Sequence, residues 1–217
     1  MRAVFAALLA AGMLITTGIA AAATVPGTPE DDAAASGVRS ETTVKVDVKR
    51  HAIAGNVIAI TGKVRPADSR RVTLKAAGKT VKSVRSDKDG NFRARWSTPG
   101  AGVYEVKAVA QATYSAERAG SASKQVNVYR AAQASYYGPG LYGNGTACGQ
   151  TLTPSTLGVA NRSLPCGTMV TFRYRGNTVR VPVIDRGPFA GNREWDLTAA
   201  TKAKLGFGST GVVLATK

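Results

Sequence analysis

The chain has 217 residues, of which 44% are hydrophobic and 19% are charged. This length and composition are typical of a globular protein with one large or two small domains, and they exclude a disordered chain and a membrane-embedded one. Lys and Arg outnumber Asp and Glu by 29 to 13, which gives a formal net charge of +16 and points to an anionic partner.

Residues 1–23 predict a secretory signal peptide. Arg2 precedes an apolar run, and the small residues Ala21 and Ala23 form an A-x-A cleavage pattern. Polar residues and a glycine at 16–18 interrupt the run, which argues against a retained membrane anchor. We therefore expect an exported protein that is extracellular or associated with the cell wall, or periplasmic if the source is Gram-negative.

Residues 24–40 predict a disordered linker, because they contain two prolines, three consecutive acids and few apolar residues. Residues 41–130 predict a β-sandwich of about seven strands, because short alternating segments are separated by turn-forming residues. The turn SDKDGNF at 86–92 resembles that of bacterial immunoglobulin-like modules, and we assign this domain no catalytic role. The predicted strands cover residues 44–48, 57–64, 72–76, 80–84, 92–96, 103–109 and 125–128.

A second domain is predicted over residues 131–217, where glycine and aromatic residues become frequent. A short link over residues 129–133 leads into it. A helix is predicted over residues 199–205, with Thr198 as its N-cap and Gly206 as its left-handed C-terminal stop. The expected strands lie near residues 134–137, 168–174, 178–184 and 211–215.

The two cysteines, Cys148 and Cys166, are predicted to form a disulfide, because an exported protein folds in an oxidising compartment. We expect no metal site, since the one histidine, His51, is distant in sequence and two thiolates alone are poor ligands for zinc. No cofactor is expected.

The segment VRVPVIDRGPF predicts an acidic side chain at the end of an apolar strand. Val179, Val181, Val183 and Asp185 lie on one face of an extended strand. Partial desolvation there favours the protonated carboxyl that a general acid requires. The alternative is a turn in which the Asp185 carboxylate caps backbone amides. A second acid, Asp196, follows shortly before the predicted helix.

Five motifs follow the order found in the double-psi β-barrel domain of rare lipoprotein A, a septal lytic transglycosylase of bacterial walls. The resemblance covers nearly all of residues 131–217. This segment is also similar to the barrels of expansins and barwin-type proteins, whose cysteines correspond to those of this chain. The motifs are ASYYG at 134–138, TACG at 146–149, LPCGT at 164–168, VIDRGPF at 183–189 and DLT at 196–198.

The resemblance implies a six-stranded double-psi β-barrel with one short helix. Together with the predicted immunoglobulin-like sandwich before it, the expected fold class is all-β. The resemblance also implies a groove that binds peptidoglycan glycan strands, with Asp185 and Asp196 as catalytic proton carriers. One carboxyl protonates the glycosidic oxygen and the muramyl 6-hydroxyl then closes onto C1. Which aspartate is the main acid stays open. Expected substrate-binding residues are Tyr136, Tyr137, Gln150, Asn161, Arg162, Arg186 and Trp195.

Two positions depart from rare lipoprotein A. Gln150 stands where Glu is usual, and Asn161 stands where His is usual. Neither amide transfers a proton at ordinary pH. The alternative function is therefore a non-catalytic, expansin-like protein that binds or loosens the wall.

The positive charge is concentrated in the first half of the chain. Residues 40–130 contain 18 Lys and Arg against 7 Asp and Glu, whereas residues 131–217 contain 9 against 3. Export argues against nucleic acid, so we expect anionic wall polymers as partners, without stable membrane insertion. A charged surface that serves only solubility is the alternative.

Overall fold

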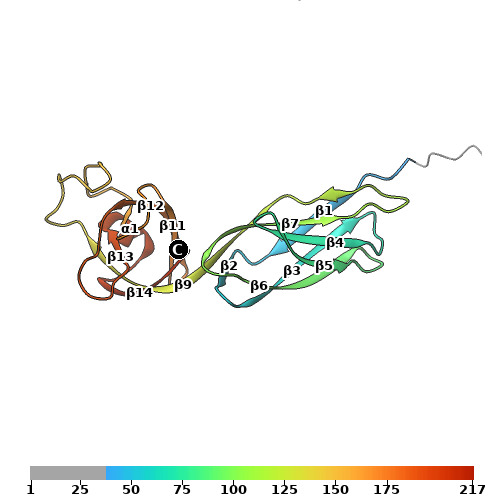
Figure 1. The fold of residues 1–217 in the computed structure, drawn as a ribbon, viewed down its shortest axis with the longest axis horizontal. Helices are drawn as coiled ribbons and strands as arrows, with labels where there is room; N and C mark the ends of the chain where they lie inside the picture. Colours follow the sequence, from blue (N-terminus) through green and yellow to red (C-terminus); the bar gives the residue numbers. More distant parts are fainter. Residues whose placement is uncertain (1–37) are drawn as a thin grey trace, which may run out of the picture. The chain divides into compact units, whose positions relative to one another are not determined.

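The computed structural model describes residues 38–217, so the predicted signal peptide and most of the predicted linker lie outside the described residues. Within this range the chain forms fourteen β-strands and one short helix, α1 (Ala199–Leu205) (Figure 1). No helix in this range is long and apolar enough to cross a membrane. The all-β fold class is confirmed.

The N-terminal domain consists of two sheets. The first sheet has the order β1-β3-β6 and is antiparallel throughout. In the second, β7 lies between β4 and β9, β5 pairs with β4, and two short strands pair with β9 and β7. The bounds are β1 (Thr43–Val48), β2 (His51–Ile53), β3 (Val57–Arg65), β4 (Arg71–Ala76), β5 (Lys79–Arg85), β6 (Asn91–Ser97), β7 (Gly102–Ala110), β8 (Ala119–Gly120) and β9 (Lys124–Tyr137).

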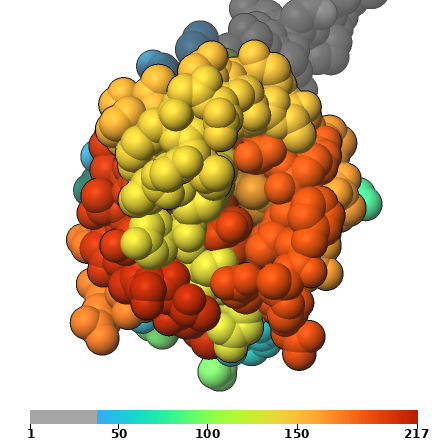
Figure 2. Space-filling view, turned by 90° about the vertical axis from the view of Figure 1, so that its left-hand side faces the viewer, coloured from blue at the N-terminus to red at the C-terminus, as the bar shows by residue number. Residues whose placement is uncertain are grey.

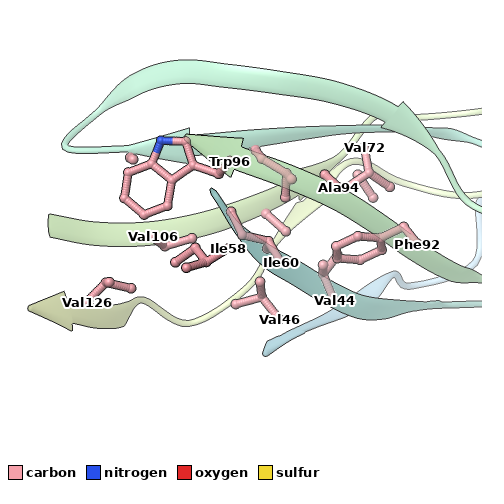
Figure 3. Close-up of a cluster of buried hydrophobic side chains, with 14 of the residues drawn as sticks. Val44, Val46, Ile58, Ile60, Val72, Phe92, Ala94, Trp96, Val106 and Val126 are labelled. Atoms are coloured by element: carbon pink, nitrogen blue, oxygen red, sulfur yellow. The ribbon is translucent and has the colours of Figure 1, made fainter. Parts of the chain in front are cut away.

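The two sheets share one hydrophobic core, because alternate residues of each strand point inward. In the first sheet every buried side chain has an even number, as the inward-facing Val44, Ile60, Phe92 and Trp96 illustrate (Figure 3). Each of the seven predicted segments lies within an observed strand. The immunoglobulin-like character of this sandwich stays a prediction.

The predicted link over residues 129–133 is wrong, because β9 continues through it without a break. Residues 124–128 of β9 pair with β7, and residues 130–135 pair with β14 (Thr210–Ala215). Tyr129 and Ala132 within this segment are buried, and its backbone is paired with neighbouring strands. The sandwich and the C-terminal domain therefore share a single strand.

The C-terminal domain is a closed ring of six strands. Around the ring the order is β9-β14-β11-β12-β10-β13, and β13 pairs again with β9 to close it. The pairs β10–β12 and β13–β9 are parallel, and the other four are antiparallel. The remaining bounds are β10 (Val159–Ala160), β11 (Met169–Tyr174), β12 (Asn177–Asp185) and β13 (Trp195–Thr198).

Helix α1 begins and ends where the sequence predicts. The Thr198 hydroxyl accepts a hydrogen bond from the Thr201 amide, and Gly206 adopts a left-handed conformation with φ of 66°. Thr201 and Leu205 are buried, which fixes the helix against the barrel. Val179, Val181 and Val183 point into the barrel core, as their alternation predicts.

Gly62 offers a test of how tightly the sandwich core is packed. It occupies an even-numbered, core-facing position of β3, where a Cβ atom would overlap the Phe92 ring and the Lys45 carbonyl oxygen. We expect Gly62→Ala to lower the free energy of unfolding by roughly 1–3 kcal/mol in urea denaturation. The control is Gly100→Ala, because a Cβ at Gly100 meets open space. Equal stability of both variants would contradict this packing.

Candidate functional site

Strand register brings the two predicted catalytic aspartates to one region of the barrel. Strand β10 lies between β12 and β13, and Ala160 of β10 pairs with Asp185 on one side and with Asp196 on the other. Two strand spacings place their backbones about 10 Å apart. The side chain between them is only a methyl group, so it leaves room beside both carboxylates.

Asp196 is half-buried in the site. Its Oδ1 accepts a hydrogen bond of 2.7 Å from the Ser135 hydroxyl, on the neighbouring strand β9. Burial raises the pKa of Asp196, while Ser135 and Arg193 act in the opposite direction and the charge of Asp185 adds to the increase. Burial therefore shifts the balance of Asp196 toward its protonated form, while Ser135 and Arg193 favour the carboxylate.

Asp185 is held by backbone donors. Its Oδ1 accepts hydrogen bonds from the amides of Ala147, at 2.9 Å, and Arg186, at 2.8 Å. This is the capping arrangement that the sequence left open as an alternative. The partial desolvation predicted for Asp185 stays a prediction. The bonded carboxylate is well oriented as an acceptor at the end of β12.

The Asp185 carboxylate also lines a pocket of about 210 Å³ beside the loop after β9. In Figure 2 the yellow residues at the end of β9 and after it border the orange residues around the end of β12, with a depression between the two. The pocket residues are Tyr137, Leu141, Asn144, Gly145, Thr146, Leu152 and Asp185. The carboxylate is thus accessible from the surface.

Tyr137 belongs to the same site. Its hydroxyl is buried close to the Asp185 carboxylate, although the two form no hydrogen bond of standard geometry. Burial is the main reason that the pKa of Tyr137 is raised well above its ordinary value, and the charges of Asp185 and Asp196 and the contact of the hydroxyl with Asp185 add to it. The hydroxyl therefore stays protonated, with its donor close to the Asp185 carboxylate.

Tyr136 lies on the other face of β9. Its ring packs against the barrel core and is covered by the Lys202 ammonium group at 4.1 Å from the ring centre, a cation–π contact. Of the two predicted substrate-binding tyrosines, only Tyr137 is brought to the carboxylates.

The predicted disulfide is present between Cys148 and Cys166, with a Cα–Cα distance of 5.7 Å. The Cys148 amide donates a hydrogen bond to the Ile184 carbonyl, and the neighbouring Ala147 amide bonds the Asp185 carboxylate. The disulfide therefore fixes the loop whose backbone positions Asp185.

Asn161 acts as a brace for its own loop. Its side-chain oxygen accepts hydrogen bonds from the Ser163 and Leu164 amides, and its side-chain NH₂ group donates to the Glu194 carbonyl. The backbone N–H of Asn161 also donates a hydrogen bond to the backbone carbonyl oxygen of Asp185. This residue borders a second pocket, of about 380 Å³, but its polar groups are already engaged by the backbone.

Arg162 and Arg186 hold loops through backbone carbonyls. Arg162 donates to the Pro188 carbonyl at 2.6 Å and to the Arg193 carbonyl at 2.7 Å, and Arg186 donates to the Leu164 carbonyl at 3.0 Å. Arg162 is exposed and lines the second pocket. Both guanidinium groups thus shape the rim of the site.

The prediction that Trp195 lines the groove is wrong. Its side chain is 1% exposed and packs edge to face on Phe172 in the barrel core, because it alternates with the outward-facing Asp196. Gln150 is exposed on the loop after β9. Glu194, two residues before Asp196, forms a paired salt bridge with Arg130.

Sequence reasoning missed Ser135 as the hydrogen-bond donor to Asp196. Ser135 lies inside the ASYYG motif, but its partner depends on the parallel register of β9 and β13, across 61 residues. No local pattern in the sequence specifies that register.

The pH dependence of stability tests the environment of Asp196. Because burial raises its pKa, the folded chain holds this proton more tightly, and the resulting stabilisation is lost as the pH rises through the folded pKa. We expect Asp196→Asn to unfold at higher urea concentration than the unmodified protein at pH 7. The difference should vanish below the ordinary aspartate pKa of about 3.9.

Asp89→Asn is the control for this measurement, since the exposed Asp89 carboxylate makes no hydrogen bond to the described residues. It should leave the pH profile unchanged. Lower stability of Asp196→Asn at pH 7 would show that the protein stabilises the ionised carboxylate.

Residues 129–215 match the double-psi β-barrel family model described as "Lytic transglycolase". The chain is 44% identical over 81 residues to the probable endolytic peptidoglycan transglycosylase RlpA of Synechocystis, covering 36% of this chain and 25% of that protein. It is 36% identical over 92 residues to the corresponding Aquifex aeolicus protein, covering 42% and 41%. The chain thus spans less than half of the length of either relative.

A solved structure, the Streptomyces papain inhibitor, is 25% identical to this chain with a TM-score of 0.34. The match covers 41% of this chain and 92% of the inhibitor.

Proposed function

We propose that this protein, whose residues 129–215 form a rare lipoprotein A-like double-psi β-barrel, cleaves the glycan strands of peptidoglycan as a lytic transglycosylase. The observation that carries the proposal is the β10 register, which sets Asp185 and Asp196 on either side of Ala160. An aspartate with a raised pKa beside one held as an acceptor is an arrangement suited to acid catalysis.

Asp196 is the proposed proton carrier. Protonated, it donates its proton to the glycosidic oxygen as the bond from C1 of N-acetylmuramic acid to that oxygen breaks. The resulting carboxylate then accepts the proton of the muramyl 6-hydroxyl, while that oxygen bonds to C1. The products are a 1,6-anhydromuramyl end and a free sugar hydroxyl, and no water is consumed. Because one group acts as acid and then base, no second proton carrier is required.

Asp185 and Tyr137 have supporting roles in this proposal. The Asp185 carboxylate is oriented by the Ala147 and Arg186 amides, and its negative charge stabilises the positive charge that develops at C1. The protonated Tyr137 hydroxyl adjoins the Asp185 carboxylate, and Tyr137 lines the same pocket, so we assign it the role of donor to a glycan oxygen that enters there. The pocket beside these residues would receive the sugar.

A second candidate function is non-catalytic binding or loosening of the wall. It is favoured by the two amides, Gln150 and Asn161, at positions where rare lipoprotein A usually has ionisable residues. Asn161 is fully engaged in bracing backbone and transfers no proton. In both functions the protein acts outside the cytoplasm, on peptidoglycan in the wall or periplasm, and anionic wall polymers are additional proposed partners.

Digestion of purified peptidoglycan distinguishes the two functions. We expect the purified chain to release fragments with 1,6-anhydromuramyl ends, detected by mass spectrometry. Asp196→Asn and Asp185→Asn should each abolish release. Glu194→Gln is the matched control and should retain activity, because the Glu194 carboxylate is paired with Arg130. Sedimentation with sacculi without any soluble fragment would support the binding function, and reducing-end products would indicate a hydrolase.

Tyr137→Phe tests this hydroxyl. We expect a loss of activity of about tenfold, corresponding to one hydrogen bond of about 1.4 kcal/mol, with little loss of stability, because the hydroxyl makes no hydrogen bond of standard geometry within the described residues. Tyr174→Phe is the control, since Tyr174 packs on Phe207 away from the carboxylates. Full activity of Tyr137→Phe in the fragment-release assay would remove Tyr137 from the site.

A further inference from the structure

The outer face of the β1-β3-β6 sheet carries a cluster of positive charge. Even-numbered residues of these strands face the core (Figure 3), so the odd-numbered residues face solvent. The strand register pairs odd positions with odd positions across all three strands. We call the five cations on this surface the basic face: Lys45, Lys63, Arg65, Arg93 and Arg95.

These five charges are not neutralised by ion pairs within the described residues. The salt bridges there join Arg70 to Asp68 and Arg130 to Glu194, and neither lies on this surface. Asp47 is the only acid among the outward-facing strand positions. Asp87, in the turn before β6, accepts hydrogen bonds from the Asp89 and Asn91 amides, and its charge also acts on Lys63. The surface therefore keeps an excess of positive charge.

One pair of these cations opposes folding. Lys45 lies directly across from Lys63 in the β1–β3 register, and like charges at such a position repel each other. Arg65 follows two residues after Lys63 on the same face, which increases the repulsion. A bound chain of negative charges would relieve this cost.

The rest of the surface carries no aromatic side chain. Most of the other outward positions are small, such as Thr43, Ala59, Thr61 and Ser97, and Val57 is an exposed aliphatic residue. The aromatic residues of these strands, Phe92 and Trp96, point into the core (Figure 3). Single-stranded nucleic acid is usually held by base stacking on aromatic residues, which this face does not offer.

The spacing of the cations suits a thin polymer with regularly repeated charges. Alternate residues of one strand are about 7 Å apart and neighbouring strands about 5 Å apart, so consecutive anionic groups meet consecutive cations. Arg65, Arg93 and Arg95 present guanidinium groups, which bind phosphate oxygens through paired hydrogen bonds.

We propose that the basic face binds a linear polyol-phosphate polymer of the cell wall, of the teichoic acid type, and retains the protein there independently of the barrel. The choice of a wall polymer as the occupant rests on the proposed function at the cell wall. The charge of the basic face is independent of that proposed function. Binding is electrostatic and weakens with salt.

Affinity for soluble polyglycerol phosphate tests this proposal in the full chain. We expect Arg93→Gln/Arg95→Gln to weaken binding about tenfold or more and to reduce its salt dependence. The matched control, Lys107→Gln/Lys217→Gln, removes the same net charge from exposed positions elsewhere and should change affinity less than about twofold. Equal losses in both variants would overturn the proposal, because net charge alone would then explain binding.

A second variant, Lys45→Gln/Lys63→Gln, removes the repelling pair. It should bind the polymer more weakly yet resist denaturation at least as well as the unmodified chain, so a folding defect does not account for the loss. If polyglutamate or single-stranded DNA of matched charge bound more tightly than polyglycerol phosphate, the phosphate polymer would be ruled out as the occupant.

The binding proposal and the enzymatic proposal can be tested independently. Asp196→Asn should bind the polymer normally. Arg93→Gln/Arg95→Gln should still digest peptidoglycan that has been freed of phosphate polymers.

Discussion

Parallel pairing between β13 and β9 closes the barrel and assembles the candidate site in the same contact. The register that sets Asp196 against Ser135 also sets Thr198 against Tyr137. On its other side β13 pairs with β10, and β10 in turn brings Asp185 alongside. A slip of one residue would turn Asp196 into the core and Trp195 to the surface. The fold and the chemistry therefore depend on one register.

The burial that suits Asp196 to carry a proton also makes its charged form costly to hold. The hydrogen bond from the Ser135 hydroxyl offsets part of this cost. The loops around the site are held in place by a disulfide and by arginine side chains. The disulfide fixes the loop that bonds Asp185, and Arg162 and Arg186 tie the neighbouring loops through carbonyl oxygens. Many polar residues near the site thus serve its shape, and few are left free to contact substrate.

Local patterns in the sequence predicted most elements of the fold. Alternation located the sandwich strands, the Thr198 and Gly206 caps delimited α1, and export with two cysteines indicated the disulfide. Contacts between distant segments were not predictable in this way. The partner of Ser135, the burial of Trp195 and the continuity of β9 through residues 129–133 all depend on pairing across the barrel.

The sharing of β9 by the two domains has a consequence for how the chain resists cleavage. Proteases cut where backbone is unpaired and mobile, and junctions between domains commonly provide such a place. Here the pairing continues across the junction without a gap, because Tyr129 pairs with Ile53 of β2 and Arg130 pairs with Ala215 of β14. Limited digestion would therefore not readily release the barrel from the sandwich.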